Sequence, residues 1–333
     1  MFRKLASALA AALALATLSL GSTNADAATT LKFGTLAPGD SAWGKEFKKW
    51  AKDVSDDTNG ELIIDFQWNG QAGDEVLMVQ KMRSGQLDGA AVTAIGLAQT
   101  GVTDVLLFQM PGLFSNWGKL DAARNAMKAD FDQQFQGKGF TVLGWGDVGA
   151  AKTMSIGFEV HHPADLQGKG CFFLAGDPIG PKLYSTIGGI NAKQVTVPEI
   201  LPNLTNGSIQ VLTVPPLAAE QLQWASRVTH INTMTTGFGI GAIIVSTPKV
   251  AGLPDNLKTV LTNRGAEAAD RLTRSIRNLD AQAFARLKSS KTAYEPSDPE
   301  KQEWRDLFSK VRAQLRGSVF TPGVFDKVVG LAQ

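Results

Sequence analysis

Residues 30–66, TLKFGTLAPGDSAWGKEFKKWAKDVSDDTNGELIIDF, contain the pattern that decides the fold. The first seven are apolar enough for a short strand, and a Pro-Gly turn follows them. Apolar side chains then recur at helical spacing until Asn59-Gly60 ends the helix. Residues 62–66 alternate in character as a half-buried strand does. The stretch therefore predicts strand, helix and strand in that order.

The next thirty residues extend this alternation. A helix is expected from Asp74-Glu75 through Met82, and it ends at Gly85. Residues 89–93 then form a strand of small side chains. Three strands joined by two helices within about 65 residues are typical of an α/β unit with a parallel sheet.

The remaining chain repeats such elements. Strands are expected at 140–156, 171–174, 194–197, 210–214 and 238–246, and helices at 117–136, 178–187, 199–206, 255–289 and 299–315. The helix at 255–289 would be about 50 Å long at 1.5 Å per residue. A helix of that length can brace two lobes.

The predicted fold is α/β, with the two lobes of a type II-like periplasmic binding protein and a long helix spanning both. We assign residues 28–147 and 236–275 to lobe I, and residues 148–235 and 276–333 to lobe II. The lobes would pivot near residues 146–149 and 235–239, where glycines allow the backbone to turn. A ligand is expected where the strand ends of the two lobes face each other.

Composition and charge limit the classes of ligand that the protein can be expected to bind. The chain has 333 residues, 44% of them hydrophobic and 19% charged, with a net charge of +2. It contains no run of five like charges, and a nucleic-acid binder normally has a basic patch. We therefore expect a small-molecule solute and no nucleic acid as the ligand.

The first 27 residues have the form of a secretory signal peptide. Arg3 and Lys4 precede sixteen residues made only of Leu, Ala, Ser and Thr, and ADA at 25–27 is a suitable cleavage site. A membrane anchor is the alternative, but it needs roughly 20 apolar residues. We expect cleavage after Ala27, with no direct membrane insertion. The single cysteine, Cys171, permits no internal disulfide, which favours the bacterial periplasm over a eukaryotic secretory path. We expect a monomer.

No motif for catalysis or for a cofactor stands out. GWGDVG at 144–149 matches the dinucleotide pattern G-x-G-x-x-G, but the residues after it look like a strand. The glycines are better explained as bending points between lobes. His161 and His162 are adjacent, a spacing that does not suit a metal site. We expect no enzyme activity, no cofactor and no metal.

Aromatic residues close to turns are the best candidates for the cavity wall, although a tryptophan at helical spacing more often belongs to the core. We assign the wall to Trp43, Trp68, Phe173 and Trp224. Gln71 and Thr93 would supply neutral polar contacts to the ligand.

Several segments, in this order, resemble the solute-binding subunit of tripartite ATP-independent periplasmic (TRAP) transporters, the DctP-type family. They are LKFGTLAP at 31–38, SAWGK at 41–45, NGQAGDE at 69–75, MRSGQLDG at 82–89, PADLQGK at 163–169 and VTVPEILPNLTNG at 195–207. The resemblance covers nearly the whole chain after the signal. It implies a two-lobe fold and delivery of a solute to the two membrane subunits of a permease.

The departures from the family pattern concern the ligand. The resemblance implies an arginine that clamps a substrate carboxylate, and Cys171 stands at that position. Lys152 matches a second family arginine and keeps a point charge as a ligand contact. We expect a solute other than a simple dicarboxylate, unless another arginine such as Arg227 replaces the clamp. A sensor that hands its liganded form to a membrane receptor is the alternative function, and a secreted enzyme is a further one.

Overall fold

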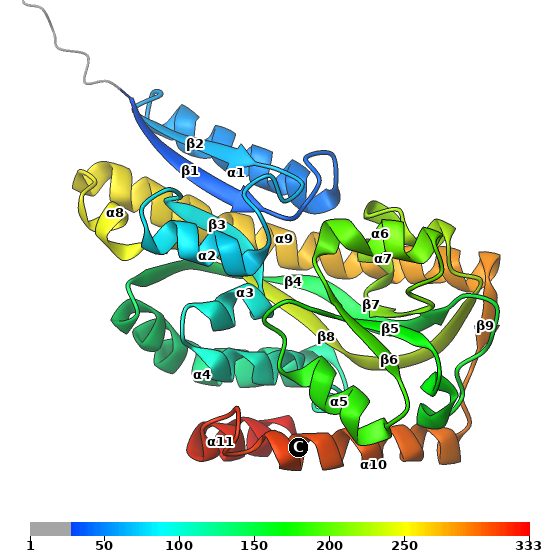
Figure 1. Cartoon of the computed structure of the whole chain (residues 1–333). Coiled ribbons are helices and arrows are strands. Elements are labelled where there is room, and N and C mark those ends of the chain that lie inside the picture. Colours follow the sequence, from blue (N-terminus) through cyan, green and yellow to red (C-terminus); the bar gives the residue numbers. More distant parts are fainter. Residues whose placement is uncertain (1–27) are drawn as a thin grey trace, which may run out of the picture.

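The computed structural model describes residues 28–333, so the predicted signal peptide lies outside the described residues (Figure 1). Its strands are β1 Thr29–Thr35, β2 Leu62–Gln67, β3 Gly89–Thr93, β4 Phe140–Ser155, β5 Gly170–Leu174, β6 Asn191–Val195, β7 Val211–Val214, β8 His230–Ser246 and β9 Thr292–Tyr294. Its α-helices are α1 Ala42–Asp57, α2 Glu75–Arg83, α3 Ala94–Gln99, α4 Trp117–Gly137, α5 Ile179–Ile187, α6 Val197–Thr205, α7 Pro216–Gln221, α8 Thr247–Ala251, α9 Asp255–Ser290, α10 Asp298–Leu315 and α11 Pro322–Ala332. Short 3-10 helices are η1 Thr103–Gln109, η2 Pro163–Leu166 and η3 Trp224–Ser226.

The main sheet has the strand order β2-β1-β3-β8-β4-β7, with β9 paired to β8. Strands β2, β1 and β3 are parallel to one another, which confirms the predicted parallel α/β unit. From β3 onward the pairs β3 with β8, β8 with β4, and β4 with β7 are antiparallel. Strands β5 and β6 form a separate parallel pair, in the part of the chain that the proposed division assigns to lobe II.

Two long strands, β4 and β8, join the lobes (Figure 1). β8 begins at His230, eight residues before the predicted start, because residues 230–237 continue the pairing into lobe II. The two predicted pivots lie opposite each other in this ladder, where Gly149 pairs with Gly239. The register shifts between Asp147 and Gly149, as at a β-bulge. Rotation at this point stays a prediction.

The long helix is present as α9, with 36 residues, and it packs along β4. Two glycines of the G-x-G-x-x-G pattern make this approach possible. A side chain at Gly144 would begin 2.4 Å from Cβ of Ala269, and Gly149 has φ +138° beside the carboxylate of Asp280. The pattern lies wholly inside β4 and opens no helix, so it serves helix packing.

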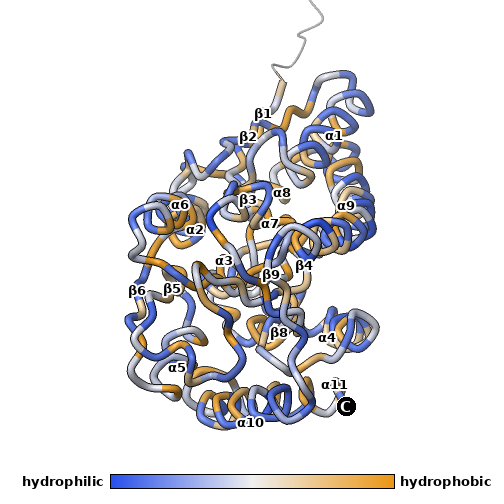
Figure 2. Tube along the Cα trace, turned by 90° about the vertical axis from the view of Figure 1, so that its right-hand side faces the viewer, coloured by the Kyte–Doolittle hydropathy of each residue, from blue (hydrophilic) through white to orange (hydrophobic). Residues whose placement is uncertain are grey.

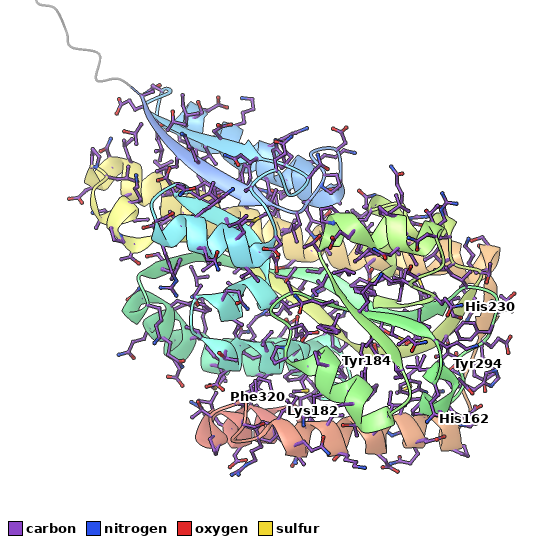
Figure 3. All side chains as sticks on the ribbon, viewed as in Figure 1. His162, Lys182, Tyr184, His230, Tyr294 and Phe320 are labelled. Carbon is purple, nitrogen blue, oxygen red and sulfur yellow. The ribbon has the colours of Figure 1, made fainter. Side chains whose placement is uncertain are left out.

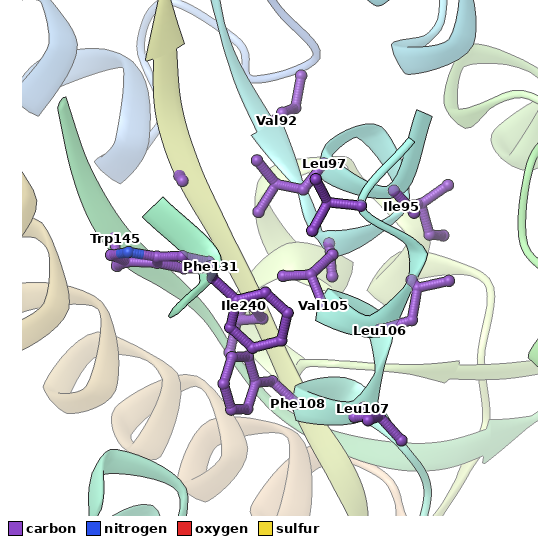
Figure 4. Close-up of a cluster of buried hydrophobic side chains, with 14 of the residues drawn as sticks. Val92, Ile95, Leu97, Val105, Leu106, Leu107, Phe108, Phe131, Trp145 and Ile240 are labelled. Carbon is purple, nitrogen blue, oxygen red and sulfur yellow. The ribbon is translucent and has the colours of Figure 1, made fainter. Parts of the chain in front are cut away.

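The largest buried core is formed mainly by residues assigned to lobe I. Figure 4 shows side chains of α3 and η1 packed against Phe131 of α4, Trp145 of β4 and Ile240 of β8. A second cluster fills the space between β1, α1 and α9. Lobe II depends on two smaller clusters, one of which includes Cys171.

The chain ends with two helices. α10 buries one stripe, formed by Trp304, Phe308, Val311 and Leu315, and hydrophobic and hydrophilic residues alternate along it in Figure 2. α11 was not expected; it packs against α4 and η1. The proposed division assigns residues 322–332 to lobe II, whereas these contacts are with elements of lobe I, so we move α11 to lobe I. No helix in residues 28–333 is long and apolar enough to cross a membrane.

Candidate functional site

A cavity of about 360 Å³ lies where the lobes meet. Residues at the carboxyl ends of four strands, β1, β3, β5 and β7, line it. This placement agrees with the rule that ligands of α/β folds bind beyond the carboxyl ends of strands. The lobes also touch beside it, where Nε2 of Gln99 in α3 donates to the carbonyl oxygen of Gly176 at 3.3 Å.

The cavity wall is mostly apolar. Its aromatic members come from both lobes and are Trp43, Phe47, Phe172, Phe173, Tyr184, Trp224 and Phe238. Small residues of β4 and β8, such as Gly146 and Gly241, form the floor between them. An apolar enclosure of this kind favours a solute with an apolar body.

The charged members of the wall are all acidic. Within the described chain, no Lys, Arg or His lines the cavity, whereas Glu75, Asp147 and Asp177 do. An anionic solute would therefore meet like charges and no side-chain cation.

Asp147 is the one carboxylate of the three that basic residues neutralise. Its side chain is fully buried, and it accepts from Nη1 of Arg124 at 2.8 Å and from Nε of Arg277 at 2.6 Å. Arg277 also binds Asp121 of α4, so the network joins α4, β4 and α9. Arg124 and Arg277, neither of which lines the cavity, therefore neutralise the charge of Asp147.

Glu75 has only neutral donors. Its carboxylate accepts from the backbone N–H of Thr93 at 2.6 Å, from Oγ1 of Thr93 at 2.7 Å and from the N–H of Gly96 at 2.9 Å. Burial raises the pKa of Glu75, and these hydrogen bonds act in the opposite direction. Its carboxylate thus occupies the N-terminus of α3.

Two further helices beside the cavity begin in the same way. Asp177 accepts from the N–H groups of Ile179 and Gly180 at the start of α5, at 2.8 and 3.2 Å. Asp280 of α9 accepts from the N–H of Leu217 at the start of α7, at 2.9 Å. Burial raises the pKa of both carboxyls. Helix N-termini commonly bind anions, and here the chain's own carboxylates occupy three of them.

The family model for DctP, described as bacterial extracellular solute-binding protein, family 7, matches residues 33–316. The chain belongs to this family.

Solved structures of DctP-type proteins have the same fold. A sugar acid binding protein from Advenella mimigardefordensis in complex with galactonate is 18% identical, with a TM-score of 0.84, over 92% of this chain and 98% of that one. DctP7 from Bordetella pertussis, which binds pyroglutamic acid, is 15% identical (TM-score 0.83; 92% and 99% covered). A TRAP solute-binding protein from Sulfurospirillum deleyianum with bound succinate is 17% identical (TM-score 0.83; 91% and 98% covered).

Four of the residues predicted for the DctP-type site line the cavity. Trp43 is nearly buried, and its Nε1 donates to the backbone oxygen of Asp147 at 3.2 Å. Thr93 lies at the end of β3, Phe173 lies in β5 and Trp224 begins η3. The structure brings these four together from both lobes, and their contact with a solute stays a prediction.

Two predicted residues lie outside the cavity. Trp68 stacks on Phe66 with a centroid distance of 4.8 Å and supports the outer part of the lobe I core. Gln71 is exposed in the turn before α2. Their position near a turn was a sound reason to consider them, but this turn follows β2, an edge strand that does not reach the cavity.

The two positions at which the family resemblance implies an arginine, Lys152 and Cys171, also lie outside the cavity wall. Lys152 points away from the cavity, because its neighbour Ala151 takes the inward position on β4. Its Nζ donates to the backbone oxygen of Thr233 and to Oγ1 of Thr235, both at 2.7 Å. Cys171 is fully buried, and burial raises its thiol pKa to about 12. The next three residues of β5, Phe172, Phe173 and Leu174, line the cavity.

Arg227, the other candidate clamp, is exposed and does not line the cavity. The residues that sequence reasoning missed are Glu75, Asp177 and Tyr184. Asp177 precedes a Pro at a helix start, a signal that was available in the sequence. Among the described residues, no three His, Cys, Asp or Glu side chains form a group that could hold a metal ion.

Proposed function

We propose that this protein captures a small, largely apolar organic solute between its lobes and delivers it unchanged to the two membrane subunits of a TRAP-type permease. Family membership supports the capture of a solute. Delivery to a permease follows the TRAP solute-binding proteins that share the fold. Export to the periplasm through residues 1–27 is part of the proposal.

The acidic, cation-free wall is the observation that carries the choice of solute. The DctP-type proteins described above bind galactonate, pyroglutamic acid and succinate. In this chain an acid would lose its hydration shell and gain no cationic partner. A charge-assisted hydrogen bond contributes roughly 1.5 to 3 kcal/mol, so an acid would be disfavoured.

Closure of the lobes on the solute belongs to the same proposal. β4 and β8 are continuous across the junction, so rotation at 146–149 and 235–239 would move lobe II as a unit. Small-angle scattering with a saturating solute should then give a smaller radius of gyration than the free protein.

Tryptophan fluorescence tests the solute class, because Trp43 and Trp224 line the cavity. We expect neutral apolar solutes to change the emission at lower concentration than succinate or galactonate. Phe173→Ala should weaken their binding about tenfold through lost apolar contact. Phe158→Ala is the matched control, since Phe158 lies in the same lobe outside the cavity. Tighter binding of succinate than of every neutral solute would contradict the proposed solute class.

A further inference from the structure

Asp177 is a carboxylate of the cavity wall that lacks a cationic partner within residues 28–333. Each of its oxygens accepts one backbone N–H, from Ile179 and from Gly180. A carboxylate has about four acceptor positions. Asp177 can therefore accept further hydrogen bonds from a group in the cavity.

Two aromatic residues, Phe173 and Tyr184, lie in the same part of the cavity wall as this carboxylate. A side chain at Gly180 would begin 2.8 Å from both Cβ of Phe173 and Oδ2 of Asp177, so glycine allows the two to lie together. The charge of Asp177 contributes to the raised pKa of Tyr184, after the larger effect of burial. The Tyr184 hydroxyl donates to the backbone oxygen of Phe172 at 2.9 Å (Figure 3 labels Tyr184 on α5). Asp177, Phe173 and Tyr184 thus line neighbouring parts of the cavity wall.

Lobe I contributes a second negative group. Glu75 is 5% exposed and lines the cavity, and its partners are neutral. Its neighbour Val76 lies near Gly176, the residue before Asp177. The segments that hold the two carboxylates therefore meet where the lobes touch.

We propose that the solute carries one ammonium group on an apolar body, and that Asp177 binds this group while Glu75 adds attraction from lobe I. This inference rests on the proposed function. An ammonium forms charge-assisted hydrogen bonds with a carboxylate and is attracted to aromatic faces. It also offsets the cost of leaving carboxylates in an apolar cavity without a counter-charge.

Three probes with a similar body separate charge from shape. They are 2-phenylethylamine, which is protonated at neutral pH, 2-phenylethanol, which is neutral, and phenylacetate, which is an anion. We expect calorimetry to show 2-phenylethylamine binding roughly 10- to 100-fold more tightly than 2-phenylethanol. Phenylacetate should bind most weakly.

Asp177→Asn tests the assignment to one residue. The amide oxygen can still accept a backbone N–H at the start of α5, so the helix keeps its cap. We expect the preference for the amine over the alcohol to fall by about tenfold, with the affinity for the alcohol unchanged. Asp74→Asn is the matched control: it removes a charge next to Glu75, but Asp74 caps α2 and lies outside the cavity wall.

The outcomes distinguish this inference from the proposed function. Equal binding of amine and alcohol overturns the ammonium group and leaves an apolar solute in place. Absence of amine binding also overturns the inference. An amine preference that survives in folded Asp177→Asn overturns the role of Asp177. Tightest binding of phenylacetate overturns both proposals.

Discussion

In lobe I, the cavity wall at the ends of β1 and β3 rests on fully buried aromatic residues, whereas in lobe II the wall made by β5 and α5 is half exposed. Phe33 of β1 has no exposed surface and packs edge-on against Trp50 at 5.3 Å. In α5 only Ile179 is buried, and three of the five residues of β5 are partly exposed.

This difference indicates that the two walls differ in rigidity. The lobe I wall is part of the packed core, so it keeps its shape whether or not a solute is present. The lobe II wall has few buried contacts, and such segments open at low free-energy cost. We infer that solute binding orders β5 and α5 more than it orders β1 and β3.

The largest effect is expected from Phe33→Ala, which removes the support of the lobe I wall. Deleting a buried aromatic ring should lower the free energy of unfolding by about 4 kcal/mol, measured by urea denaturation. Leu77→Ala is the control, because Leu77 is 40% exposed on α2 and should change stability by less than about 0.5 kcal/mol. Similar losses for the two variants would refute the packed-wall description.

Asp147→Asn tests the ion-pair network that joins α4, β4 and α9 at the junction of the two walls. Removing the charge leaves Arg124 and Arg277 without their buried partner, and the free energy of unfolding should fall by about 3 kcal/mol. Asp326→Asn removes one partner of an exposed ion pair with Arg316, and we expect no measurable change. If both variants unfold at the same urea concentration, the network does not hold the junction.

Lys152 lies five residues further along β4, where it is buried and donates to the backbone oxygen of Thr233 and to Oγ1 of Thr235. Burial lowers its pKa to about 8 from an ordinary value of 10.5. Between these values the unfolded chain binds a proton that the folded chain does not, so stability should rise with pH by at most about 3 kcal/mol. Lys152→Met should remove this rise in urea denaturation at a series of pH values. An unchanged pH dependence in the variant would show that other groups cause it.

The sequence predicted the lobe I unit well because its strands and helices alternate in short, strongly patterned segments. It predicted α9 for a similar reason, since 36 residues contain no internal proline. It missed the first half of β8, because residues 230–237 are mostly polar or small and gain their strand structure from pairing with β4.

The site was predicted less completely, and the reasons are geometric. A shift of one residue along a strand reverses the direction of a side chain, which is why Ala151 lines the cavity and Lys152 does not. In β5 the cavity wall begins at Phe172, one residue beyond the buried Cys171. The helix-start pattern at Asp177 was visible in the sequence, but its place in the cavity wall depends on the packing of α5, which sequence spacing does not give.

Tyr184→Phe is expected to have the smallest effect and to act on lobe II alone. The lost hydrogen bond to the backbone oxygen of Phe172 joins α5 to β5 and contributes about 1 kcal/mol. Amide hydrogen exchange in α5 should therefore speed up about fivefold, while exchange in β1 stays unchanged. Tyr294→Phe is the matched control, since Tyr294, the other tyrosine, donates to Glu300 and does not line the cavity. Equal acceleration in β1 and α5 would mean that the walls open together, and the proposed difference between them would be lost.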